Sequence, residues 1–433
     1  MMLILTLFYL IIFVLGFHFG WISNPYDELR VIQVILVFAL IVFLFFSRQV
    51  KSLSGNEYLL NILFLFLSLL IINFNNIFQV YELGMWLGMW LIFFSLLHVD
   101  YNKKYNELSL IILVIVSILP CLFLPIVIYE FINTSKMYDW QMNSSSIRIY
   151  DSFIIPIFWL AVFFRYKNKE IINKLYPIIC FLVTLALLVD GARSALLSIV
   201  LPLMLMLILD KKNRCLIFLT FLYLGLALLA YKLMFLTHNY LSSDSINLNI
   251  ARFSTSYRYE IWVYMFEKWL ESPLLGIGGG YLAEHHFKYG HHMHNVYLRF
   301  IFEWGVLGIF ILVYIFYKLY YLFKSSISIA LKMGVLAILI DAAFSGNFIY
   351  PASQVACVLF FAIAFSEMRI INANQNKKKY YSSKILVVLY GIAFTVITIF
   401  FIGQDFLCFQ CSSMDGRAAP YFWEHGGSQR LSK

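Results

Sequence analysis

A histidine and two arginines are the residues of this chain best suited to chemistry, because each lies at the edge of a long apolar run. His294 stands just before the apolar run that begins at Val296, so a rigid element would hold it in place. Its imidazole has an ordinary pKa of about 6.5, which suits a general base near neutral pH. Arg258 and Arg193 could each bind an anion through charge-assisted hydrogen bonds. We therefore expect His294, Arg258 and Arg193 to be catalytic.

Arg193 ends a short turn, D-G-A-R, that starts at Asp190 and separates two apolar runs. A charge so close to hydrocarbon is costly and usually has a partner or a function. One interpretation is an Asp190–Arg193 pair that closes the turn. The other, which the position favours, is a cation at the mouth of a cavity that meets an anionic headgroup, with Asp190 also contacting the substrate.

Arg258 opens a segment with Trp262, Met265 and Trp269 at helical spacing. This pattern predicts an amphipathic helix that lies at the membrane interface. Arg258 would occupy its first turn, where free N–H groups also attract anions. A solvated arginine is the alternative. Arg252, a few residues upstream, is expected to contact the substrate.

Arg299 and Glu303 are four residues apart in the apolar run after His294, so they share one helix face. Charges inside membrane helices usually face the bundle interior. They could form a structural pair or line the substrate cavity. We expect substrate contacts from Arg299 and Glu303, from Asn295 beside His294, and from Asp341 near the outer end of a later span.

The densest group of titratable residues is a histidine tract: His285, His286, His291, His292 and His294. A metal site is one interpretation of such a tract, but only Glu284 adds a nearby carboxylate and no cysteine joins it. A solvated tract is the other, and we expect no metal. Cys408 and Cys411 form a lone C-x-x-C, which we interpret as incidental.

The glycine-rich stretch at 276–280 superficially suggests a phosphate loop. No G-K-[ST] follows it, so a nucleotide site is excluded and we expect a flexible turn. No cofactor is expected.

The composition shows what must position these residues. Of 433 residues, 62% are hydrophobic and 13% are charged, which indicates a multi-pass membrane protein rather than a soluble domain. Apolar runs able to cross about 30 Å of hydrocarbon recur along the chain. The expected spans are 2–22, 31–47, 57–73, 80–98, 108–129, 152–165, 175–190, 194–209, 215–236, 296–317, 326–344, 352–368 and 385–403.

This pattern predicts an all-α polytopic integral membrane protein of about 12–13 transmembrane helices with one large loop outside the membrane, which the resemblance described below makes periplasmic. We expect an N-terminal transmembrane bundle at 1–236, a catalytic loop at 237–295, a C-terminal bundle at 296–403 and a disordered tail at 404–433. Lysine and arginine gather in alternate connections, for example at 165–174, 211–214 and 369–384. The positive-inside rule then places the N-terminus in the cytoplasm and the 237–295 loop outside. The cations are too dispersed for nucleic-acid binding.

Three motifs follow one another on the expected outer side. They are A-R-S-A at 192–195, Y-R-Y-E-I-W at 257–262 with E-S-P-L-L-G-I-G-G-G at 271–280, and H-N-V-Y-L at 294–298 with F-E-W-G-V-L-G at 302–308. The ordered set resembles the O-antigen ligase and O-antigen polymerase superfamily, the membrane glycosyltransferases of the bacterial envelope. The resemblance is strongest over about 190–310.

The resemblance implies metal-independent transfer of a glycan from undecaprenyl diphosphate to an acceptor sugar hydroxyl, at the periplasmic face of the bacterial inner membrane. Arg193 and Arg258 would stabilise the departing diphosphate, and His294 would take the acceptor proton. A polymerase is slightly favoured over a ligase that uses lipid A-core. The implied partners are the undecaprenyl-diphosphate-linked oligosaccharide, an acceptor glycolipid (a lipid-linked repeat or lipid A-core), membrane lipids and a chain-length regulator.

Two rival classes remain open. A polysaccharide flippase or transporter would place charges near the membrane midplane in repeated halves. This chain has no evident internal repeat, and its charges gather at the outer ends of the spans. A metal-sensing or metal-transporting protein would use the histidine tract.

Overall fold

A computed structural model of the chain describes residues 1–21, 25–46, 53–136, 140, 147–241, 257–285, 292–373, 380–381 and 384–399. Arg252, His286, His291 and the expected tail at 404–433, with Cys408 and Cys411, lie outside these ranges. The predictions made for them stay predictions.

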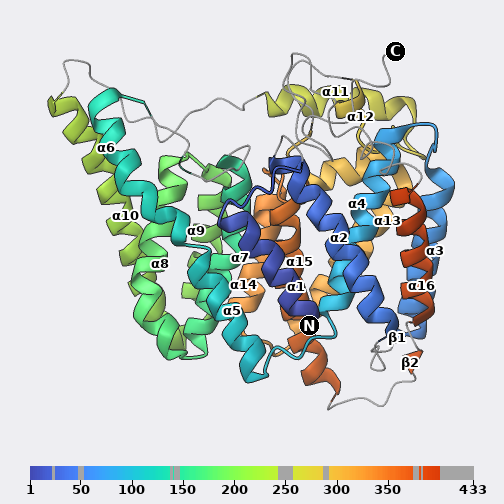
Figure 1. Ribbon diagram of the computed structural model, residues 1–433, viewed down its shortest axis with the longest axis horizontal. Helices are drawn as coiled ribbons and strands as arrows, with labels where there is room; N and C mark the ends of the chain where they lie inside the picture. The colour runs from blue at the N-terminus through green and yellow to red at the C-terminus, as the bar shows by residue number, and fades with distance from the viewer. Residues whose placement is uncertain are drawn as a thin grey trace.

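The described chain is almost entirely helical, and the predicted all-α membrane class is confirmed (Figure 1). The elements are α1 (Met2–Val14), α2 (Pro25–Phe46), β1 (Leu53–Ser54), α3 (Gly55–Ile71), α4 (Ile77–Leu96), α5 (Lys104–Val116), η1 (Leu119–Phe123), α6 (Leu124–Thr134), α7 (Ile147–Tyr166), α8 (Glu170–Val189), α9 (Arg193–Leu209), η2 (Lys211–Asn213), α10 (Arg214–Leu241), α11 (Arg258–Glu271), α12 (Tyr281–Glu284), α13 (Val296–Lys324), α14 (Ile329–Ala342), α15 (Pro351–Ala373), β2 (Tyr380–Tyr381) and α16 (Lys384–Ile397). The two strands form a single short antiparallel pairing.

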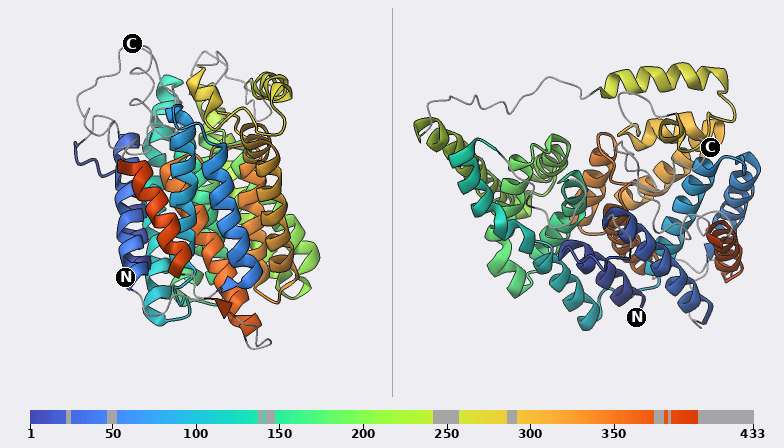
Figure 2. Two further views of the ribbon diagram at one scale, coloured as in Figure 1. Left: turned by 90° about the vertical axis from the view of Figure 1, so that its right-hand side faces the viewer. Right: turned by 45° about the horizontal axis from the view of Figure 1, so that its top comes forward.

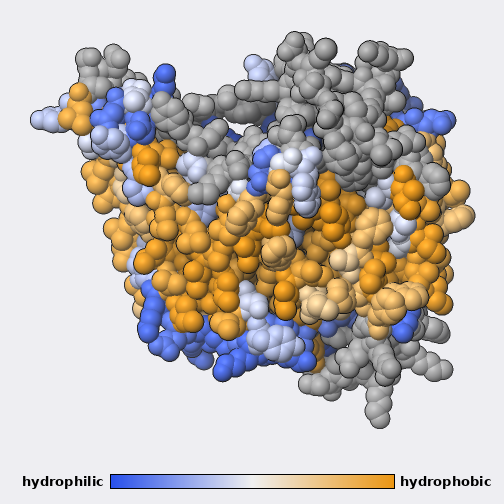
Figure 3. Space-filling model, viewed as in Figure 1, coloured by the Kyte–Doolittle hydropathy of each residue, from blue (hydrophilic) through white to orange (hydrophobic). Residues whose placement is uncertain are grey.

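Every expected span overlaps a helix or, for 108–129, the run from α5 to α6. Among the described residues, eight helices are long and apolar enough to cross a membrane, and four more are apolar but shorter. Figure 3 shows the result as an apolar belt, with hydrophilic side chains along much of its lower edge and in patches along its upper edge.

Proline and glycine account for two interruptions in these spans. Pro120 and Pro125 lie in and beside η1, which separates α5 from α6, because proline lacks a backbone N–H and blocks regular helix. In α13 the break is at Gly305, whose φ of 55° and ψ of −134° are outside the helical region. The helix therefore has two halves, and the first half begins just after His294.

The helices differ widely in how much of their surface is inside the protein. α7 is central: 89% of the residues in its most apolar stretch are buried inside the protein, and it packs on α8, α14 and α15. α10 is peripheral: only 22% of the residues in its most apolar stretch are buried, and it contacts α8, α6 and α9. Because exposed apolar surface on a membrane protein faces lipid, α10 marks an edge of the bundle, as Figure 1 shows.

The predicted amphipathic helix is present as α11, which lies across the end of the bundle opposite the N-terminus (Figures 1 and 2). A small outer core, separate from the main core, joins α11 to α12 and to the first half of α13. Its buried members are Ile261, Met265, Leu282, Met293 and Phe302.

The glycine-rich stretch is a turn, as expected, but it is packed on both sides rather than flexible. Its backbone enters the break in α13: the Gly278 N–H donates to the Glu303 carbonyl, and the Val306 N–H donates to the Leu274 carbonyl, both at 3.0 Å. A Cβ on Gly276 would lie 2.4 Å from the Glu303 carbonyl oxygen. The turn thus clamps the C-terminal end of α11 onto α13.

Candidate functional site

His294 is held between two backbone anchors at the start of α13. Its φ of 51° is left-handed, an uncommon conformation for a residue other than glycine. On one side, the Asn295 side chain caps α13 by accepting a hydrogen bond from the Leu298 N–H at 3.0 Å. On the other, the indole N–H of Trp262 donates to the Met293 carbonyl at 2.8 Å. Asn295, predicted to bind substrate, thus has a capping role in the described structure.

Arginines at the starts of three helices act on His294 or on its neighbour Arg258: the charges of Arg258 and Arg148 act on His294, and that of Arg193 acts on Arg258. Arg258 is the first residue of α11, Arg193 is the first residue of α9, and Arg148 lies in the first turn of α7. Burial lowers the pKa of His294 to about 3, and the positive charges of Arg258 and Arg148 contribute to that shift. The imidazole is therefore neutral at neutral pH.

The pKa of Arg258 is also shifted by its surroundings. Burial lowers the pKa of its guanidinium, and the charges of Arg148 and Arg193 act in the same direction, while Asp341 opposes them. Like charges this close are costly unless an anion offsets them. In addition, Nε of Arg258 is buried without a hydrogen-bond partner among the described residues. Buried donors are normally satisfied, so this atom suits an oxygen of an anionic ligand.

Carboxylates on neighbouring helices surround the arginines. Asp151 contacts Arg148 at 3.5 Å, and Arg148 also donates to the Gly191 carbonyl at 3.4 Å, which ties α7 to the D-G-A-R turn. Asp190 in that turn accepts a hydrogen bond from the Trp140 indole at 2.8 Å. Asp341 is buried and accepts one from Ser345 at 2.5 Å.

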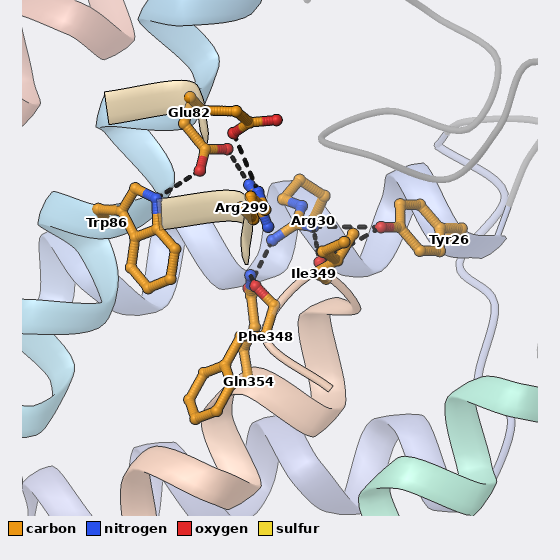
Figure 4. Close-up of polar contacts among 9 residues, drawn as sticks. Tyr26, Arg30, Glu82, Trp86, Arg299, Phe348, Ile349 and Gln354 are labelled. Atoms are coloured by element: carbon orange, nitrogen blue, oxygen red, sulfur yellow. Dashed lines mark hydrogen bonds and ion pairs between the residues drawn. The ribbon is translucent and has the colours of Figure 1, made fainter. Parts of the chain in front are cut away.

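Arg299 and Glu303 lie away from this cluster, in a buried triad with Glu82 of α4 (Figure 4). Arg299 bonds Glu82 through Nη2 and Glu303 through Nε, the latter at 3.2 Å. The side chains are 2%, 0% and 3% exposed for Arg299, Glu82 and Glu303. This geometry favours the structural alternative for the pair. Their predicted substrate contacts stay predictions.

A second buried network joins α2 to α15 beside the triad (Figure 4). Arg30 donates to the side chain of Gln354 at 2.8 Å and to the Ile349 carbonyl at 2.6 Å. Tyr26 and Gln33 also accept from Arg30, at 3.2 and 2.6 Å. The triad joins α4 to α13, and the Arg30 network joins α2 to α15.

The histidine tract is only partly described. His292 is buried, with its ring centroid 3.7 Å from that of His294, whereas His285 stacks on Tyr281. Within the described ranges, no group of three or more His, Cys, Asp or Glu side chains could hold a metal ion.

The structure thus brings together His294, Arg258, Arg193 and Asp341, with Asp190 at the edge. It adds Arg148, which was not singled out from the sequence. A signal was present, because Arg148 lies on the expected outer side, where the positive-inside rule makes cations scarce. Glu82 and Arg30 were also missed, although a charge within or at the start of an apolar span is a recognisable signal.

Residues 178–313 match the family model described as O-Antigen ligase. This segment is similar to the O-antigen ligase family, which supports the O-antigen ligase and polymerase superfamily. The match runs from α8 into α13 and includes Arg193, Arg258 and His294, whereas Arg148 precedes it. No curated protein matches the chain. The match supports glycosyl transfer of the O-antigen ligase or polymerase type by a multi-pass membrane protein that uses lipid-linked sugars and glycolipids.

Proposed function

We propose that this protein transfers a glycan from undecaprenyl diphosphate to an acceptor sugar hydroxyl, as an O-antigen polymerase or ligase, with polymerase slightly favoured. The observation that carries the proposal is arginine charge gathered at one base: Arg258 and Arg148 act on His294, and Arg193 acts on Arg258, whose Nε is buried without a hydrogen-bond partner among the described residues. Several cations next to one neutral base suit a reaction with a polyanionic leaving group and a proton to remove.

In the proposed reaction, the acceptor hydroxyl oxygen attacks the anomeric carbon of the donor sugar. The bond from that carbon to the phosphate oxygen breaks, and the diphosphate leaves with the bonding electrons. The guanidinium groups of Arg148, Arg193 and Arg258 stabilise its charge without a metal ion. His294 accepts the hydroxyl proton, and attack opposite the leaving group inverts the anomeric configuration.

The donor also activates the base in this scheme. The positive charges of Arg258 and Arg148 help to lower the pKa of His294 to about 3, which makes it a weak base. A diphosphate bound between these arginines would offset their repulsion of the imidazolium, so the pKa of His294 would rise. The base would gain strength only when the donor is in place.

The test is a transfer assay with purified protein in liposomes, a polyprenyl-diphosphate oligosaccharide and either a lipid-linked repeat or lipid A-core as acceptor. A new glycosidic bond is expected, with the same yield in EDTA, and a His294→Ala variant should form none. Elongated lipid-linked glycan identifies a polymerase, and glycosylated lipid A-core identifies a ligase. Movement of the glycan across the bilayer without a new bond would identify a transporter and refute the proposal.

We also propose that the site faces the periplasm of the inner membrane, within a catalytic loop at 237–295. Support comes from α11, which lies at the end of the bundle opposite the N-terminus. In a cysteine-free background, Glu267→Cys on α11 should react with an impermeant maleimide in cells whose outer membrane is permeabilised. Lys104→Cys at the opposite end should react only after lysis. The reverse pattern would refute the orientation.

A further inference from the structure

α11 carries two residues that reach toward His294 from one face. Arg258 and Trp262 are four residues apart, so they lie one turn from each other on the helix. The charge of Arg258 acts on the His294 imidazole, and the indole N–H of Trp262 binds the carbonyl of the residue before it, Met293, at 2.8 Å. One helix therefore carries both a charge that acts on the side chain of His294 and a hydrogen bond to the backbone that precedes it.

The backbone at His294 needs such support. A histidine with φ of 51° occupies a sparsely populated conformation, which persists only where neighbouring contacts determine it. Asn295 fixes the following residues through the α13 cap, and Trp262 fixes the preceding peptide. The packing of Met293, which is 1% exposed, and the buried His292 ring beside that of His294 add to this support.

The packing around this bond is limited. The outer core that joins α11 to α13 contains five buried residues and is separate from the main core. The packed glycine turn ties only the far end of α11, through the Leu274 and Gly278 backbone. At the other end, which carries Arg258 and Trp262, the indole bond and the outer core join α11 to the start of α13.

We propose that Trp262 is a positioning residue that sets the His294 imidazole against the Arg258 guanidinium, an inference that rests on the proposed function. The indole bond fixes the register between α11 and the peptide before His294. The diphosphate held by Arg258 and the hydroxyl proton taken by His294 then lie at a defined separation.

The chain offers a matched control in Trp269. It lies on the same helix and packs on the same outer core, against Phe302. Its indole nitrogen is buried without a hydrogen-bond partner among the described residues. Replacing either tryptophan by phenylalanine removes an indole N–H and some apolar area, but only Trp262→Phe breaks a hydrogen bond.

The experiment measures kcat and KM for the donor in liposomes. Trp262→Phe should lower kcat by about tenfold and leave the donor KM within twofold, because the arginines still bind the diphosphate. Trp269→Phe should stay within twofold in both. The acidic limb of kcat against pH should also shift in Trp262→Phe alone, since the imidazole changes its distance from Arg258.

A second substitution guards against loss of folding. Benzothienylalanine, incorporated at position 262, keeps the shape of the indole and replaces only the N–H by sulfur. It should reproduce the tenfold loss of kcat, and the same analogue at position 269 should have no effect. If the analogue at 262 matches wild type while His294→Ala is inactive, the positioning role is refuted and the proposed function stands. If His294→Ala keeps wild-type activity, the proposed function itself is refuted.

Discussion

The arginines at the end of the bundle and the arginine buried between α4 and α13 differ in what surrounds them. Arg299 lies between two carboxylates, and the triad is almost fully excluded from solvent. Burial lowers the pKa of Arg258, and the charges of Arg148 and Arg193 act in the same direction, while Asp341 opposes them. In the first arrangement both carboxylates are bonded to the arginine between them. In the second, Arg258 keeps a buried Nε without a hydrogen-bond partner among the described residues, which suits an oxygen of an anionic substrate.

The comparison also separates residues that hold the helices in place from residues proposed to take part in the reaction. The triad, the Arg30 network and the packed glycine turn hold helices in place below and beside the site. The residues proposed to react come from helix starts: α7, α9, α11 and the position before α13. Substitutions in the two regions should therefore fail in different ways, one through stability and the other through rate.

The largest expected effect is the loss of Arg299. Arg299→Ala leaves two buried carboxylates facing each other, and breaking a buried ion pair from one side costs about 3–5 kcal/mol. We expect little folded protein by size-exclusion chromatography in detergent. A combined Arg299→Met, Glu82→Gln and Glu303→Gln variant removes all three charges and should recover much of the yield. Normal thermal stability of Arg299→Ala would contradict the structural role of the triad.

Arg258→Ala should act in the opposite way. It removes a cation proposed to bind the leaving group, so kcat/KM should fall by about 10²–10³. Thermal stability should be unchanged or slightly higher, because repulsion by Arg148 and Arg193 is relieved. Lys268→Ala, on the same helix and paired with exposed Glu271, is the control and should keep full activity. A lower melting temperature for Arg258→Ala would show that Arg258, like Arg299, stabilises the fold, and would contradict this prediction.

Gly276→Ala tests the packed turn. A Cβ there would meet the Glu303 carbonyl oxygen, and the φ of 79° disfavours any other residue, so we expect a cost of about 2 kcal/mol. Activity should also fall, because α11 is displaced from α13. Gly225→Ala in α10, where a Cβ meets nothing within 4 Å, should be neutral or slightly stabilising. Equal melting temperatures for the two variants would show that the turn is not clamped.

The smallest expected effect is in the pH dependence of wild type. Because the pKa of His294 is about 3 in the free protein, it remains deprotonated throughout the neutral range. The value of kcat/KM should therefore vary by less than about twofold between pH 6 and 8. In Arg148→Gln the pKa of His294 should rise, and the acidic limb should move to higher pH. A wild-type limb near pH 6.5 would contradict the lowering of the His294 pKa by burial and by the arginine charges.

Much of the fold was predictable from hydropathy, because each span is a continuous apolar run whose period and length are set by the bilayer. The site was predictable where local sequence carried the signal. His294 precedes a helix, Arg193 follows a span, and Arg258 opens an amphipathic segment.

The remainder depended on contacts between distant residues. Glu82 and Arg299 are 217 positions apart, so the sequence around Arg299 showed only its neighbour Glu303. The 276–280 stretch has the composition of a flexible turn. Its rigidity comes from the break in α13, which no local pattern at the glycines reveals.

The break at Gly305 has a consequence for how the enzyme meets bilayers of different thickness. Before the break, α13 buries Phe300, Phe302 and Trp304 against protein, whereas after it Phe310, Val313 and Tyr317 are exposed toward acyl chains. A thinner or thicker membrane acts on the second half, which can tilt at the glycine. The histidine end stays attached to α4 and the turn. Changing the acyl-chain length of the lipids should therefore alter the tilt of the second half of α13 in the membrane. The geometry around His294 should be preserved.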